Sequence, residues 1–124
     1  MPTHRGSQNI LKPVFDSLKE GDVEGSYSLI SDIFKDNLDS EDVTCAYDAI
    51  FFWKAKIEYS THYSSPFEKG EYIFSQWAMF MHYMRKYGDK YEFVIYTLKY
   101  CMFNIIINFY TEAFGIYFLI CSGF

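Results

Sequence analysis

Apolar residues recur every three or four positions along most of the chain, which is the spacing of amphipathic helices. Four ranges follow this spacing, at about 8–20, 23–37, 40–62 and 66–87. A fifth range, about 90–114, is apolar on nearly every side. We predict one helix in each range, so the pattern favours an all-α fold.

Glycines and polar residues indicate where these helices begin and end. Gly21 can end the first helix in a left-handed conformation, and Asp22 can cap the second. Because so short a connection separates two amphipathic helices, we expect them to form an antiparallel hairpin. Further on, the sequence Ser65 to Glu68 combines a capping hydroxyl, a proline and a glutamate three residues later, which predicts the start of the fourth helix.

The fifth range permits two interpretations. Its many β-branched and aromatic residues would also suit a strand. We predict a helix because the range is long, and because Gly88 followed by the cap Asp89 and by Glu92 repeats the stop-and-start pattern. The last ten residues, 115–124, should form either a sixth short helix or a tail packed on the others.

A chain of 124 residues is long enough for one domain with its own core. We predict a single domain over 1–124, with a first hairpin at about 8–37, a second at about 40–87 and a third unit at about 89–124. The helix at 40–62 has an apolar face so wide that two neighbours must cover it. It should therefore be the interior helix.

Two helix hairpins in succession resemble tetratricopeptide repeats. In that family a glycine-aspartate turn joins two helices, a small residue lies early in the second helix, and an apolar residue follows four places later. The matching positions are the turn Gly21-Asp22, the small residue Gly25 or Ser26, the apolar Ile30, the corresponding pair Gly70 and Phe74, and the first-helix pattern of Ala46, Ala49 and Trp53.

The resemblance covers about 8–88, and the third unit is too hydrophobic to match the family. Leu38 stands where the family usually has proline, and the second turn is lengthened through 60–65. What the resemblance implies is a short right-handed solenoid of five or six helices that acts as a protein-interaction scaffold. It also implies a concave groove, lined by the first helix of each hairpin, that binds a protein or peptide.

The charge of the chain narrows the class of partner. The net charge is −5, which argues against nucleic-acid binding, because that function needs clustered lysines and arginines. Between Asp16 and Asp48 there are ten acidic residues against only Lys19 and Lys35. This acidic surface is either a solvated face or a docking face for a basic partner.

No pattern of catalytic or metal-binding residues is present, so we expect no enzyme activity, no metal and no cofactor. The histidines lack ligand spacing, and the odd number of cysteines shows no CxxC motif, which suits buried thiols in a reducing compartment. The amino-terminal segment lacks the apolar stretch of a signal peptide, so a cytoplasmic location is expected. The residues concerned are His4, His62 and His82, and Cys45, Cys101 and Cys121.

Aromatic residues make up 22% of the chain, and two sets of them are candidate binding residues. Aromatic side chains anchor protein interfaces, and a nearby lysine could hold an acidic peptide or a carboxylate terminus. Stripe aromatics are alternatively core residues. The candidate partner-binding residues are Tyr47, Trp53, Lys54 and Tyr59, and Trp77 and Tyr83 could line the same groove.

The second set lies in the apolar carboxyl-terminal part. The end of a helical array exposes an apolar surface when its last helix lacks a polar outer face. We therefore predict self-association, and hence a homodimer, through Phe103, Ile107, Tyr110 and Phe114. A membrane span is the alternative, because 101–124 contains only one charged residue. Polar residues such as Asn104 and Asn108 make that alternative less favourable.

Overall fold

The structure is a computed structural model that describes the backbone of residues 3–121 and the side chains of residues 10–115. The described part is all-helical and contains no strand, which confirms the predicted all-α class and the helical interpretation of the fifth range. In chain order the elements are α1 (Thr3–Lys19), α2 (Val23–Lys35), α3 (Glu41–Ser60), α4 (Pro66–Ser75), α5 (Trp77–Met84), the 3-10 turn η1 (Arg85–Tyr87) and α6 (Glu92–Cys121).

The predicted helix boundaries are correct where local chemistry sets them. Gly21 and Gly88 have positive φ angles of 82° and 67°, and each follows a helical segment. The Asp22 side chain accepts a hydrogen bond of 2.8 Å from the backbone N–H of Gly25. Ser65 likewise accepts from the backbone of Glu68 at 3.2 Å, as the capping sequence predicted.

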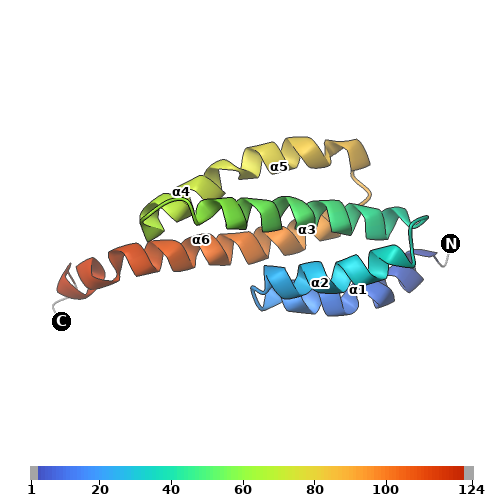
Figure 1. Cartoon of the computed structure of the whole chain (residues 1–124), viewed down its shortest axis with the longest axis horizontal. Helices are drawn as coiled ribbons and strands as arrows, with labels where there is room; N and C mark the ends of the chain where they lie inside the picture. The colour runs from blue at the N-terminus through green and yellow to red at the C-terminus, as the bar shows by residue number, and fades with distance from the viewer. Residues whose placement is uncertain (1–2, 122–124) are drawn as a thin grey trace.

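The prediction of one continuous helix over 66–87 is wrong. The α-helix is interrupted at Gln76. The backbone N–H of Gln76 bonds to the carbonyl of Ile73, which is three residues earlier in the chain, whereas an α-helix would use the carbonyl four residues earlier. The next residue, Trp77, stacks on Trp53 of α3 at 5.6 Å and contacts Phe103 of α6 at 5.6 Å. The helix therefore turns where Trp77 is held between its two neighbours, and α4 and α5 are separate segments (Figure 1).

Both expectations for the ends of the last helix need correction. α6 begins at Glu92, so Tyr91 precedes the first helical residue and Asp89 lies in the turn before it. Tyr91 is 4% exposed and donates a hydrogen bond of 2.7 Å to Glu41, which fixes the position of this helix start. Residues 115–121 are neither a separate helix nor a tail, because α6 continues through Gly115 without a positive φ angle; residues 122–124 lie outside the described part.

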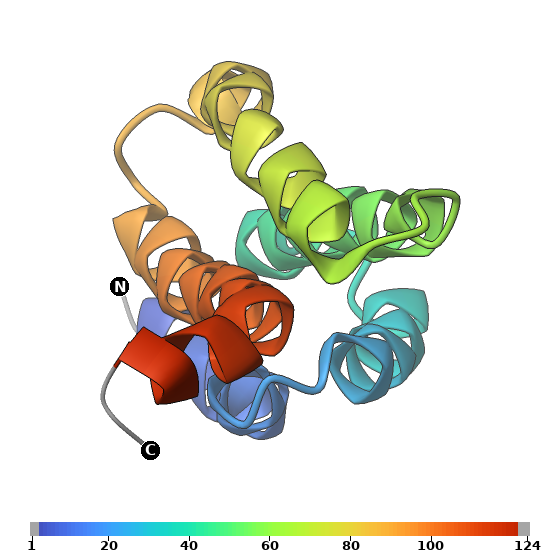
Figure 2. The same ribbon diagram turned by 90° about the vertical axis from the view of Figure 1, so that its left-hand side faces the viewer.

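α3 is the interior helix, as predicted, and packs against α1, α2, α4, α5 and α6. Trp53 lies at the centre of the core and is fully buried, as is Phe80 of α5. α1 packs against α2 and also against α6, where Phe15 meets Phe93 edge to face at 5.5 Å. In Figure 2, which looks nearly along the helices, α6 lies between α1 and the α4–α5 arm.

The arrangement leaves one helix only partly covered. α6 has 30 residues and is therefore about 45 Å long. Figure 1 shows α1 and α2 beside the amino-terminal part of α6, while the carboxyl-terminal part extends past them next to α4. The last buried α6 side chain among those described is Ile106.

Candidate functional site

One face of α6 carries a continuous row of apolar and aromatic side chains on the side away from the core. Its members alternate in spacing between four and three residues, and at about 100° per residue they lie within about 40° of one line along the helix. The opposite side contributes Val94, Leu98 and Cys101 to the core. We call this row the α6 stripe: Tyr96, Tyr100, Phe103, Ile107, Tyr110 and Phe114.

Most of the α6 stripe is open to solvent. Tyr96 is 75% exposed, Tyr100 and Ile107 are each 56% exposed, and Phe114 is 39% exposed. Phe103 is half-buried because its ring packs against Trp77 at 5.6 Å. Isolated exposed apolar residues are ordinary on protein surfaces, but a contiguous row of them indicates an interaction surface.

α4 extends this surface on one side of the stripe. Phe67, which is 42% exposed, contacts Phe114 edge to face at 5.5 Å, and Phe74, which is 57% exposed, stacks parallel to Phe103 at 6.4 Å. Because α4 contacts α6 in the reverse order of residue number, the two helices are antiparallel. Gly70 allows α4 and α6 to approach each other closely, since the Cβ of Phe109 and the ring of Tyr110 lie directly over it.

Two hollows adjoin the stripe, one near each of its ends. The carboxyl-terminal hollow has a volume of about 440 Å³. At its edge the Tyr110 hydroxyl donates a hydrogen bond of 2.5 Å to Glu71, and burial followed by this carboxylate raises the pKa of Tyr110 to about 12. The phenol stays neutral at physiological pH and engages the acid. The lining residues are Phe67, Glu71, Ile107, Tyr110, Thr111 and Phe114.

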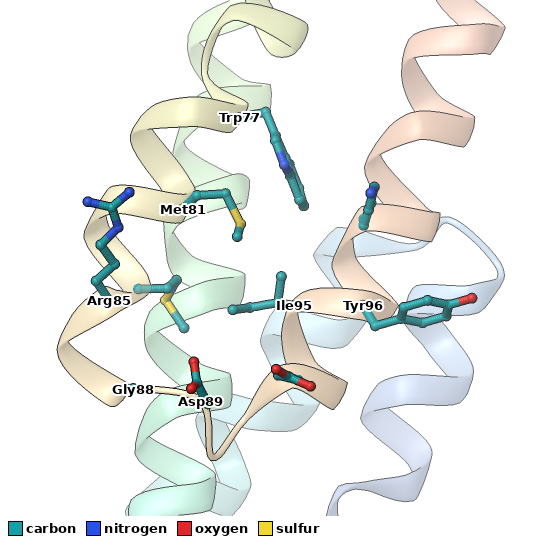
Figure 3. Close-up of a pocket in the computed structure, with 10 residues that line it drawn as sticks. Trp77, Met81, Arg85, Gly88, Asp89, Ile95 and Tyr96 are labelled. Carbon is teal, nitrogen blue, oxygen red and sulfur yellow. The ribbon is translucent and has the colours of Figure 1, made fainter.

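The amino-terminal hollow lies between α5 and α6 and has a volume of about 480 Å³. In Figure 3, Trp77, Met81 and Ile95 point into it, and Asp89 lies at the end next to the α5–α6 connection. Its rim carries charges of both signs. The lining residues are Trp77, Met81, Met84, Arg85, Gly88, Asp89, Glu92, Ile95, Tyr96 and Lys99.

The connection that forms one wall of this hollow is tied to α3 by repeated polar contacts. Tyr87 donates a hydrogen bond to Asp48, and Lys86 lies 3.2 Å from the same carboxylate. Four residues later, Tyr91 and Lys90 contact Glu41 in the same way, at 2.7 and 3.6 Å. We call residues 85–91 the strap. The hydrogen bond from Tyr91, and then the charge of Lys90, hold the pKa of Glu41 below its ordinary value of 4.5.

Three of the predicted self-association residues meet in one place. Ile107, Tyr110 and Phe114 line the carboxyl-terminal hollow, and Phe103 continues the same row toward the amino terminus of α6. Sequence reasoning missed Tyr96 and Tyr100, although the alternating spacing of four and three continues through them. It also missed Phe67 and Phe74, whose part in the surface depends on which side of α6 the α4 helix packs.

The predicted partner-binding residues are not brought together into one groove. Tyr47 is half-buried in an aromatic cluster with Tyr27, Phe34 and Phe51, of which the last is 49% exposed. Tyr59 lies in a second cluster with His62, Tyr63 and Tyr72. Trp53 is buried and stacks on the half-buried Trp77, and Tyr83 packs on Phe52 at another edge.

Lys54 is engaged within the chain. Its ammonium lies 2.7 Å from Glu58 and 4.0 Å from Glu24, and 4.9 Å from the centre of the Tyr27 ring. The hydrogen bond to Glu58, followed by the charge of Glu24, raises the pKa of Lys54. An acidic peptide would therefore have to displace two carboxylates to reach it.

The two cysteines among the described side chains are not suited to act as nucleophiles. Cys45 and Cys101 are buried, and burial raises the pKa of their thiols to about 12 and about 11, so both stay protonated and unreactive. The side chain of Cys121 lies outside the described residues. Among residues 10–115, no group of three or more histidine, cysteine, aspartate or glutamate side chains could hold a metal ion.

The segment Glu92–Gly115 of α6 is long and apolar enough to cross a membrane, by length and composition alone. Core helices of soluble proteins meet the same criteria. No protein family, no curated protein and no solved structure matches this chain.

Proposed function

We propose that this protein is a helical protein-interaction module that associates with a second copy of itself through the α6 stripe. The observation that carries the proposal is the exposed apolar row along α6, which continues onto Phe67 and Phe74 of α4. A row of this length in water gains free energy when another apolar surface covers it.

The accessible surface area of the chain is large enough to include an interface of ordinary size. It is 7890 Å², whereas a compact monomer of 14.7 kDa exposes about 6900 Å². The excess of about 1000 Å² is close to the roughly 800 Å² that each partner contributes to a standard interface.

The charge of the surface favours a second copy over a different protein. A two-fold interface places the same patch on both sides, so its centre cannot carry a net charge of one sign. The centre of the α6 stripe is uncharged, and the nearby Glu71 is held by Tyr110. An acidic or basic partner would find little charge here to recognise.

The tetratricopeptide-like architecture is a further part of the proposal. Its support is the order of packing, in which α1 contacts α2, α2 contacts α3 and α3 contacts α4. The left-handed turn at Gly21 is of the kind that the family uses. Since α1 also contacts α6, we propose that α6 closes a short right-handed array instead of extending it.

A heterologous protein is the second partner that we propose, on the surface around Tyr47. Phe51 is 49% exposed beside Tyr47 and Tyr27, and such aromatic clusters serve as interface anchors. Captured proteins should change when Tyr47 and Lys54 are replaced by alanine. If the double variant captures the same proteins as the natural chain, binding at this surface is contradicted.

The test of self-association is the molar mass in solution at tens of micromolar. We expect a dimer for the natural chain and a monomer for Ile107→Lys, because the new ammonium would be buried in an apolar interface. The matched control is Leu38→Lys, which adds the same charge at a residue that is 65% exposed outside the stripe and should remain dimeric.

A monomeric natural chain under these conditions would overturn the proposal. So would partition of the natural chain into the detergent phase together with loss of the dimer, since the stripe would then face lipid. Circular dichroism should show the same helix content for both lysine variants, because both side chains are exposed in the isolated chain.

A further inference from the structure

We infer that the two copies pack with their α6 helices antiparallel, and that the Phe67–Phe114 edge of each copy covers the amino-terminal hollow of the other. This inference rests on the proposed self-association. It adds the orientation of the second copy and assigns an occupant to a hollow that no described residue of the same chain fills.

The spacing of the α6 stripe permits a close helix pair. Alternation of four and three gives an average of 3.5 residues per repeat, which is the pattern of helices that pack side by side along a common seam. The stripe is also symmetric about position 105. In an antiparallel pair Tyr96 therefore meets Phe114, Tyr100 meets Tyr110, and Phe103 meets Ile107.

A parallel pair would satisfy the same spacing, so the surroundings of the stripe decide the orientation. The amino-terminal hollow lies on one side of the stripe, the side of α4 and α5, whereas the carboxyl-terminal hollow lies over Ile107, Tyr110 and Phe114 of the stripe itself. A two-fold axis perpendicular to α6 places the α4 helices of both copies on the same side of the helix pair. It also pairs the amino-terminal end of each α6 with the carboxyl-terminal end of the other. A two-fold axis along α6 would place the two α4 helices on opposite sides, so the Phe67–Phe114 edge of neither copy would reach the amino-terminal hollow of the other.

The exchange of ends places an apolar edge against an apolar hollow. In the antiparallel pair, Phe114 of the second copy lies opposite Tyr96, which lines the amino-terminal hollow. Phe67 contacts Phe114 of its own copy at 5.5 Å, so Phe67 of the second copy lies beside the same hollow. Aromatic rings of this kind suit the wall formed by Trp77 and Met81, because methionine adapts its shape to aromatic neighbours.

The charges beside the stripe agree with this orientation. Glu71 bonds to Tyr110, whose counterpart on the second copy is Tyr100, and Lys99 is the neighbour of Tyr100. Each Glu71 therefore approaches the Lys99 of the other copy. Arg85 also lies on this rim, while Asp89 lies next to the α5–α6 connection, farther from the centre of the pair (Figure 3).

Disulfide trapping distinguishes the two orientations. In a chain with Cys121→Ser, the variants Tyr96→Cys and Phe114→Cys are oxidised mildly, alone and as a mixture. We expect a disulfide-linked pair only in the mixture. Antiparallel packing separates the two copies of position 96 by about 27 Å along the helix, far beyond the roughly 7 Å limit between linked Cα atoms.

Each other result has a distinct meaning. Linkage of Tyr96→Cys alone, with the natural chain still a dimer, would overturn the antiparallel geometry and leave self-association standing. A dimer without any linkage would also overturn this geometry. A natural chain that is monomeric by light scattering would instead overturn the proposed function itself.

Charge reversal provides an independent measurement. Glu71→Lys and Lys99→Glu should each raise the dimer dissociation constant, on the order of five-fold, and the double variant should recover most of the loss. Additive weakening in the double variant would contradict contact between Glu71 and Lys99. The control is Lys12→Glu, whose ammonium contacts only Asp16 among the described ion pairs and should leave dissociation unchanged.

Discussion

At the scale of single residues, Gly70 shows how a small side chain shapes the interaction surface. A Cβ atom at this position would lie 3.0 Å from the Tyr110 ring and 3.2 Å from the Cβ of Phe109. The second contact involves an atom next to the backbone, so it cannot be relieved by rotation of a side chain. The close approach of α4 and α6, and with it the position of Phe67, depends on the missing methyl group.

Gly70→Ala should therefore lower the free energy of unfolding, by about 1–2 kcal/mol, because the helices must separate. Gly115→Ala is the matched control, since nothing lies within 4 Å of a Cβ there. It should raise the free energy of unfolding by about 0.5–1 kcal/mol through better helix propensity. Urea denaturation of both variants measures the difference, and equal effects would contradict a packing role for Gly70.

At the scale of secondary-structure elements, local capping sets the boundary between α3 and α4. The Ser65 hydroxyl accepts from the Glu68 backbone at 3.2 Å and donates to the Glu68 carboxylate at 3.0 Å. Both bonds use atoms that lie within four residues of one another. α4 can therefore begin at Pro66 whatever packs against it.

Ser65→Ala should lower the free energy of unfolding by about 1 kcal/mol, because the first-turn amide loses its acceptor. Ser28→Ala makes the same chemical change at an exposed position inside α2 and should leave stability unchanged or slightly higher. Thermal unfolding followed by circular dichroism compares the two. A similar melting temperature for both variants would mean that the cap does not contribute.

These cases explain which elements could be predicted from the sequence. Helix ends at Gly21, Ser65 and Gly88 follow from neighbouring residues, and all were predicted. The break at Gln76 and the start of α6 depend on Trp77 and Tyr91. The residues that these two side chains contact are far away in the chain, so neither boundary could be predicted from neighbouring residues. The stripe was partly visible as spacing, whereas the hollows beside it require knowledge of how α4 and α5 pack.

At the scale of the whole molecule, the strap joins the second half of the chain to the first. Its two tyrosines reach carboxylates on α3 that are 39 and 50 positions earlier in the chain, and its two lysines contact the same carboxylates. The strap also forms a wall of the amino-terminal hollow, so its position controls the space available there.

The strap should make stability depend on pH. The pKa of Glu41 is lowered in the folded chain, so its carboxylate stabilises the fold above about pH 4.5, and this contribution is lost as pH falls through the lowered pKa. Glu41→Gln should therefore melt at a lower temperature than the natural chain at about pH 6, with the difference vanishing toward about pH 3. Glu20→Gln, at an exposed residue outside the strap, should show no such convergence.

The contact between α1 and α6 has a consequence for how the protein is made. Phe15 finds its partner Phe93 only after more than half of the chain has followed it from the ribosome. At roughly 5–20 residues per second, the apolar side of α1 waits several seconds for α6. α2 can already pack against α1 in the nascent chain, but a ribosome that stalls before Glu92 would leave the part of α1 around Phe15 without its cover from α6.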